Sequence, residues 1–171
     1  MAGALIKIDE EIVSSDVSSV SLTGIDSTYN VFMVSYNNVT IDVDIKQLKW
    51  RYRNASGDVT SANYDKARKI LKVNAGYTNS AGENATAFNT VSIGTGTQEQ
   101  ANGILYLFNF NNSSEYSFHT EEASSYDYQP TNAGIQGTGV LTVTEAHTGL
   151  TFFPESGNIA SGRFVLYGLK K

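Results

Sequence analysis

Two histidines are the side chains of this sequence best suited to acid–base chemistry near neutral pH. His119 and His147 lie in a chain rich in serine, so an imidazole base beside a serine nucleophile is conceivable at either position. Hydrolases often present such a serine on a sharp turn of the Gly-x-Ser-x-Gly type, and no signature of this kind surrounds either histidine. We therefore expect neither histidine to be catalytic, and we expect the protein not to be an enzyme.

Acidic side chains offer two further kinds of chemistry. Asp42 and Asp44 alternate along segment 40–45, so on a strand both carboxylates would share one face and could bind Ca²⁺. No Asp-x-Asp-x-Asp-Gly loop supports such a site, and the favoured interpretation is an acidic sheet edge that discourages unwanted strand pairing. Other carboxylates could form the acid–base pair of a glycosidase, but the sequence places no two of them around a sugar: Glu115, Glu121, Glu122, Asp127, Glu145 and Glu155. We expect no bound metal and no cofactor.

The run Tyr126, Asp127 and Tyr128 is the best candidate for contact with a ligand. A tyrosine ring offers a face on which a sugar can stack, and a neighbouring carboxylate can accept hydrogen bonds from hydroxyl groups. A simpler interpretation is that these aromatic side chains fold back onto the protein or lie in a subunit interface. Both interpretations place the run in a loop.

Charge and composition exclude several classes of partner. The formal net charge is −5, which does not favour nucleic acid, and the basic run at residues 46–53 is interpreted as a solvated strand face. No apolar stretch approaches the roughly 18 residues that span a bilayer, so we expect no membrane partner. The chain has no cysteine for disulfides, and its first ten residues lack the features of a secretion signal. We therefore expect synthesis in a cytoplasm.

Alternating apolar and polar residues predict that these groups are carried by β-strands. Aromatic residues make up 11% of the chain, and the long runs of Leu, Glu, Lys and Ala that favour helices do not occur. Segment 62–73 fits either a short helix or a bent strand, and we expect a strand. Turns are expected at 37–38, 54–57 and 111–114, and loops at 74–87 and 94–97. Strands are expected in the regions 17–22, 29–36, 48–53, 104–110, 115–122, 140–144, 150–153 and 163–169.

Eight to ten short strands without a helical pattern or a fixed repeat predict one all-β domain over residues 1–171. The expected architecture is a β-sandwich of the jelly-roll kind, in which turn residues separate strands of similar length. Four side chains are expected between its two sheets, because each lies in an alternating or wholly apolar strand: Trp50, Tyr52, Phe108 and Leu166.

The closing segment, residues 152–170, resembles the last segment of many virion proteins of tailed bacteriophages, marine phages among them. The shared pattern is Ser-Gly-Asn-Ile-x-Ser-Gly-x-Phe-x-Leu-Tyr-Gly, and segments 22–29 and 104–112 are similar to the same proteins. The matching residues are Ser156, Gly157, Asn158, Ile159, Ser161, Gly162, Phe164, Leu166, Tyr167 and Gly168. The resemblance implies a structural role in the virion, and it supplies no catalytic residues.

Within a virion, the sequence favours a capsid decoration (cement) protein over a tail-fibre or receptor-binding component, since no coiled-coil or repeat forms a fibre shaft. The apolar side chains of Leu5, Ile6 and Ile8 suggest that residues 1–10 form an extended assembly arm. The expected partners are the major capsid protein or other virion proteins and further copies of the chain, as a trimer. A carbohydrate-binding module that recognises a host-surface glycan is a further alternative.

Overall fold

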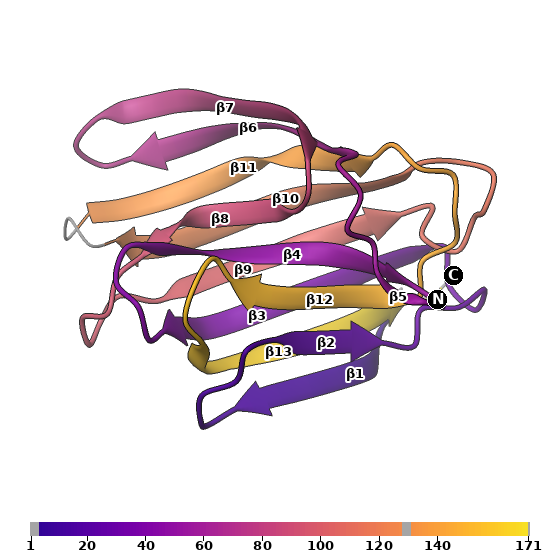
Figure 1. Cartoon of the computed structure of the whole chain (residues 1–171), viewed down its shortest axis with the longest axis horizontal. Helices are drawn as coiled ribbons and strands as arrows, with labels where there is room; N and C mark the ends of the chain where they lie inside the picture. The colour runs from indigo at the N-terminus through magenta and orange to yellow at the C-terminus, as the bar shows by residue number, and fades with distance from the viewer. Residues whose placement is uncertain (1–3, 128–130, 171) are drawn as a thin grey trace.

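The chain folds into two antiparallel β-sheets packed face to face, which confirms the predicted β-sandwich (Figure 1). The computed structural model describes residues 4–127 and 131–170. The larger sheet has the order β1 (Leu5–Val13), β13 (Ile159–Leu169), β3 (Val31–Ile41), β9 (Ala101–Phe108), β10 (Ser117–Asp127), β11 (Thr131–Leu141), β6 (Tyr64–Lys72) and β7 (Gly76–Ala85). The smaller sheet has the order β2 (Val20–Thr23), β12 (Gly149–Pro154), β4 (Lys46–Asn54) and β5 (Gly57–Asp58), and β8 (Phe88–Ile93) also pairs with β4.

The core lies between the two sheets and is rich in aromatic rings. Trp50, Tyr52 and Leu166 are fully buried in it, as the alternation predicted. The prediction for Phe108 is wrong, because β9 turns Leu105 and Leu107 inward. Since neighbouring side chains of a strand point to opposite faces, Phe108 lies half-buried on the outer face of the larger sheet.

Two predicted breaks in the sheet are instead parts of strands. Residues 74–87 hold strand β7, which pairs with β6 along its length and forms an edge of the larger sheet. Residues 37–38 lie inside β3 at a β-bulge, where Asn38 has a left-handed φ of 53° and the pairing with β9 shifts register. The expected strand at 62–73 is confirmed as β6.

The closing segment forms β13, between β1 and β3 in the larger sheet. Its glycines allow close approaches of the backbone. A Cβ on Gly168 would lie 2.3 Å from the ring of Tyr29, and one on Gly157, where φ is +77°, would lie 2.1 Å from Oδ1 of Asp42. Packing therefore accounts for two residues of the phage-like motif.

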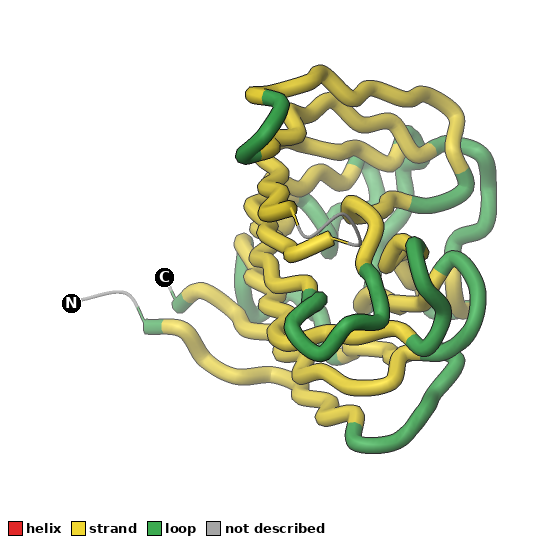
Figure 2. The backbone as a smooth tube through the Cα atoms, turned by 90° about the vertical axis from the view of Figure 1, so that its left-hand side faces the viewer, coloured by secondary structure: helices red, strands yellow, loops and turns green. Residues whose placement is uncertain are grey.

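Strand β1 places the start of the chain beside its end. Leu5 pairs with Leu169 and the backbone N of Lys170 donates a 3.0 Å hydrogen bond to the carbonyl oxygen of Ala4, so the two strands lie side by side near their described ends (Figure 2). Leu5 and Ile6 are 49% and 40% exposed, whereas Ile8 packs against the core. Residues 5–10 are thus paired within their own sheet, and any assembly contact through them would use the outer edge of β1.

Candidate functional site

Both histidines lie in a polar layer buried between the sheets. His119 Nδ1 is 2.6 Å from the hydroxyl of Tyr52, and burial lowers the pKa of His119 to about 3. Burial also lowers the pKa of His147, although Glu145 beside it acts in the opposite direction. Both imidazoles are therefore neutral at pH 7.

Ser117, His147 and Glu145 follow one another in the order of a catalytic triad. Ser117 Oγ is 2.8 Å from His147 Nδ1, and His147 Nε2 is 3.4 Å from Glu145 Oε1. Ser117 has no exposed surface, and His147 is 1% exposed. In this arrangement Ser117 offers no surface to a substrate, and the expectation that neither histidine is catalytic stays a prediction.

Strand β10 contributes to this layer because its polar side chains point into the core and an apolar side chain points outward, the inverse of the usual alternation. Its inward side chains include Ser117, His119 and Glu121, while Phe118 between them points outward and is 40% exposed. The inward groups find partners on distant strands, such as Arg68 on β6, whose Nη1 is 3.5 Å from Glu121 Oε1. In the sequence, a polar residue on each side of Phe118 was the only sign of this inversion.

The predicted pair of strand carboxylates does not form. Asp42 and Asp44 follow the end of β3 in a turn, where their side chains cap other loops. Asp42 accepts hydrogen bonds from the backbone N and side-chain Nδ2 of Asn158 at 2.7 and 2.9 Å, and Asp44 accepts one from the backbone N of Thr95 at 3.2 Å. Within residues 4–127 and 131–170, no group of three or more acidic or histidine side chains is placed to bind a metal.

The outer face of the larger sheet carries a group of apolar side chains. Ile104, Tyr106 and Phe118 are 38–40% exposed there, because the smaller sheet packs on the opposite face. Register across β13, β3, β9, β10 and β11 places six more apolar residues on the same face. Two of these six, Met33 and Val165, are buried at 8% and 1% exposure. We call the exposed and half-buried remainder the outer apolar patch: Val31, Ile104, Tyr106, Phe108, Phe118, Val140 and Tyr167.

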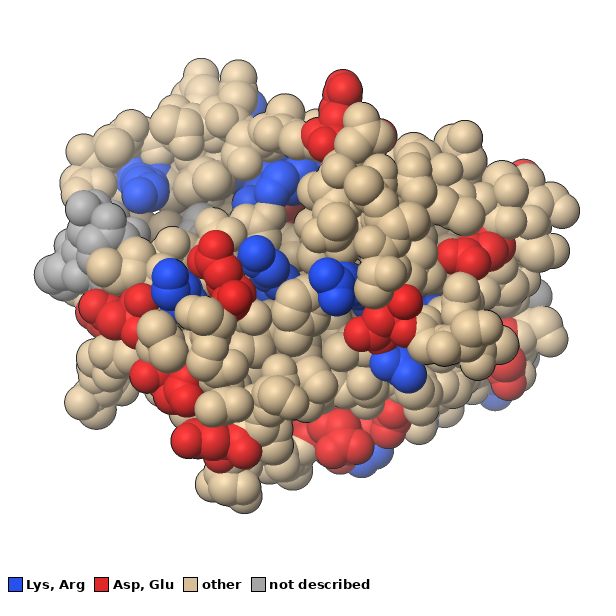
Figure 3. Space-filling model, in the orientation of Figure 1, with Lys and Arg blue, Asp and Glu red and all other residues tan. Residues whose placement is uncertain are grey.

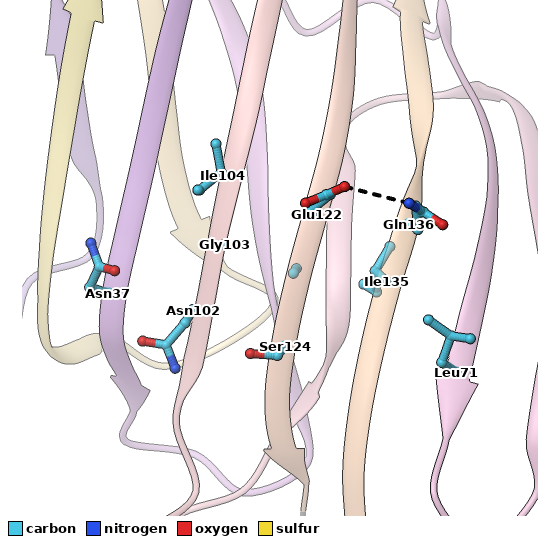
Figure 4. Close-up of a pocket in the computed structure, with 10 residues that line it drawn as sticks. Asn37, Leu71, Asn102, Gly103, Ile104, Glu122, Ser124, Ile135 and Gln136 are labelled. Atoms are coloured by element: carbon cyan, nitrogen blue, oxygen red, sulfur yellow. Dashed lines mark hydrogen bonds between the residues drawn. The ribbon is translucent and has the colours of Figure 1, made fainter. Parts of the chain in front are cut away.

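Beside this patch lies a polar hollow of about 540 Å³ (Figure 4). Gly134 lies between Ser124 and Leu71 in the register of the sheet, so the floor lacks a side chain at this point. Gln136 Nε2 donates a hydrogen bond of 3.4 Å to Glu122 Oε1 on the next strand. The polar hollow is lined by Asn37, Leu71, Asn102, Gly103, Ile104, Glu122, Ala123, Ser124, Ile135 and Gln136.

One residue of the predicted ligand-contact run lies near this hollow but does not line it. Tyr126 is 41% exposed and follows Ser124 by two positions on β10, so the two side chains share the outer face. Asp127 ends β10, not a loop as predicted, and Tyr128 lies outside the described residues. Ligand contact by these three residues stays a prediction. The sequence did not predict the polar hollow, because the residues that line it come from separate strands.

Comparisons with known proteins leave the family open. No protein-family model, no curated protein and no solved structure matches the chain. Among the described residues there is no helix long and apolar enough to cross a membrane.

Proposed function

We propose that the chain is a non-enzymatic structural subunit of a tailed-phage particle, made in the host cytoplasm and assembled into the virion as a capsid decoration protein. The outer apolar patch is the observation that carries this proposal. Contiguous exposed apolar surface on a folded domain usually marks a contact with another protein. Here aromatic rings such as Tyr106 and Phe118 stand on a rigid sheet, where little side-chain freedom is lost on binding.

The phage-like closing segment supports the particle as the place of this contact. It forms β13, and Tyr167 of this strand lies in the outer apolar patch. The same segment therefore builds the core and part of the proposed docking surface. The partner we propose is the major capsid protein, and the exposed edge of β1 would add contacts to it or to further copies of this chain, which we expect to form trimers.

A binding experiment with intact particles tests this contact. Tyr106→Ser combined with Phe118→Ser should leave the sandwich folded, since both side chains are already partly exposed, and should abolish co-sedimentation with particles that lack the protein. Val73→Ser is the matched control, because Val73 is 78% exposed and lies outside the patch. Equal binding by the double variant and the wild type would contradict the proposed surface.

The polar hollow favours a second candidate, recognition of a host-surface glycan by a tail-fibre or receptor-binding component or by a free carbohydrate-binding module. Amide, carboxylate and hydroxyl groups on neighbouring strands can bond the hydroxyls of a sugar ring, and Tyr126 offers a ring face beside them. Screening against neutral oligosaccharides tests it. Binding that is lost in Gln136→Ala and kept in Asn79→Ala would favour this role, and no binding to any glycan would count against it.

A further inference from the structure

The smaller sheet stops at β8 and leaves part of the larger sheet's inner face uncovered. Beyond β8, the inner face of β6 and β7 borders an open cleft of about 360 Å³. Figure 1 shows β6 and β7 extending past β8 at the top of the molecule. The cleft is lined by Gln47, Lys66, Arg68, Ile70, Lys72, Thr78, Ser80, Asn89, Thr90 and Ser92.

These ten residues include three cations and no carboxylate, in a chain whose net charge is −5. The cations come from Lys66, Arg68 and Lys72, which alternate along β6 and therefore share its inward face. Figure 3 shows Lys and Arg side chains gathered on this side of the molecule, over β4, β8 and β6. The cleft thus concentrates positive charge in an otherwise acidic protein.

The charge of Lys66 is poorly compensated. Its amine bonds the neutral amide oxygen of Asn89, and among the described residues no carboxylate lies within ion-pair distance of it. Burial and the nearby Arg68 guanidinium lower the pKa of Lys66 to about 8. An anion beside this amine would reverse that unfavourable electrostatic environment.

Arg68 is also short of negative charge. It is 7% exposed, and the one carboxylate within ion-pair distance among the described residues is Glu121, at 3.5 Å. Burial raises the pKa of Glu121, so its surroundings disfavour the charged carboxylate. Glu121 Oε2 also has no hydrogen-bond partner among the described residues. Lys66 and Arg68 therefore both face the cleft, and among the described residues one carboxylate, Glu121, lies within ion-pair distance of Arg68 and none lies within that distance of Lys66.

We propose that this cleft binds a tetrahedral oxyanion, a sulfate or phosphate group. Lys66 and Arg68 supply charge, and the hydroxyls of Thr78, Ser80 and Ser92 supply neutral donors around it. The cleft is larger than one such anion needs, so the group can arrive free or as the ester of a larger molecule such as a sulfated glycan. This site is separate from the outer apolar patch and does not depend on the particle role.

Titration with sodium sulfate at constant ionic strength, followed by NMR of the intact chain, tests the proposal. Saturable shifts are expected for amides of β6, β7 and β8, with none in sodium chloride. Lys66→Met should weaken binding about tenfold or more, the effect of losing one charge-assisted contact. Lys69→Met is the matched control, because Lys69 is on the same strand but points to the other face, and it should bind like the wild type. Ser80→Ala is a second probe of the cleft and should weaken binding to a smaller extent.

A second arm separates the two sources of the anion. A sulfated oligosaccharide that binds more tightly than inorganic sulfate, while its unsulfated form does not bind, identifies a glycan ester as the preferred ligand. Equal affinity for the sulfated oligosaccharide and for inorganic sulfate identifies the free anion as the ligand. Shifts that do not saturate, or equal weakening by Lys66→Met and Lys69→Met, would overturn the proposal.

Discussion

Acidification should destabilise the protein through His119. This side chain is 1% exposed, and the rings of Phe88 and Trp50 lie 4.4 and 5.7 Å from it, measured between centroids. Its pKa is about 3 in the folded protein, mainly because burial disfavours the charged ring and secondarily because of Arg68. In the unfolded chain a histidine titrates near its ordinary value of about 6.5. The unfolded state therefore binds a proton more readily between these two values.

The sign and size of the effect follow from this difference. The contribution of neutral His119 to stability is fully present above pH 6.5, and it is lost as the pH falls from 6.5 towards 3. Each pH unit in this window costs about 1.4 kcal/mol, so acidification from pH 7 to pH 4 should cost roughly 3 kcal/mol. This is a large share of the 5–15 kcal/mol typical of a whole domain.

Urea unfolding at pH 4, 5, 6 and 7 measures this loss, with the fluorescence of Trp50, the only tryptophan, as the signal. Glu121, whose pKa is raised by burial, acts in the opposite direction as the pH falls, so the wild-type profile alone is not decisive. His119→Gln removes the titrating ring and keeps a polar partner for Tyr52, and its profile should be flatter by about 3 kcal/mol. Parallel profiles for the two proteins, or an NMR titration of folded His119 near pH 6.5, would refute the reasoning.

Three further predictions concern stability and assembly. Trp50→Ala should lower the free energy of unfolding by about 3–5 kcal/mol, and the emission of native Trp50 should be blue-shifted, whereas a solvent-like spectrum would contradict its burial. Gly157→Ala should lower the free energy of unfolding in urea more than Gly76→Ala, because both positions have positive φ but only a Cβ at position 157 would clash with Asp42. Equal losses of stability would mean that the turn at Gly157 shifts to accommodate the methyl group. Deletion of residues 1–8 should leave a folded sandwich by circular dichroism and abolish self-association in sedimentation, and unchanged association would remove β1 from the assembly surface.

Alternation in the sequence located the strands whose two faces differ in environment. In β4, Leu48, Trp50 and Tyr52 point into the core while charged residues alternate with them, and the predicted strand at 48–53 was confirmed. Strand β7 gave no such signal, because it pairs only with β6 at the edge of the sheet and is largely exposed. A strand without a buried face carries no hydrophobic pattern, so the segment was predicted to be a loop.

The candidate surfaces could not be predicted, because each depends on pairing between distant segments. The buried side chains of His119 and Glu121 find their polar partners in Tyr52 and Arg68, respectively, which lie more than fifty residues away in the sequence. This inversion turns Phe118 outward and so contributes to the outer apolar patch. Local patterns carry no information on which strands become neighbours, and both the polar hollow and the cationic cleft arise where neighbours meet.

The copy number of this chain in purified phage particles tests the central claim most directly. If a phage genome encodes this chain as proposed, quantitative mass spectrometry of its particles against the major capsid protein would give the ratio of the two chains. A decoration protein should be present in hundreds of copies per particle, in a fixed ratio to the capsid protein, whereas tens of copies or fewer would place it in the tail. Absence of the chain from purified particles would contradict the claim that it is a structural subunit of the virion.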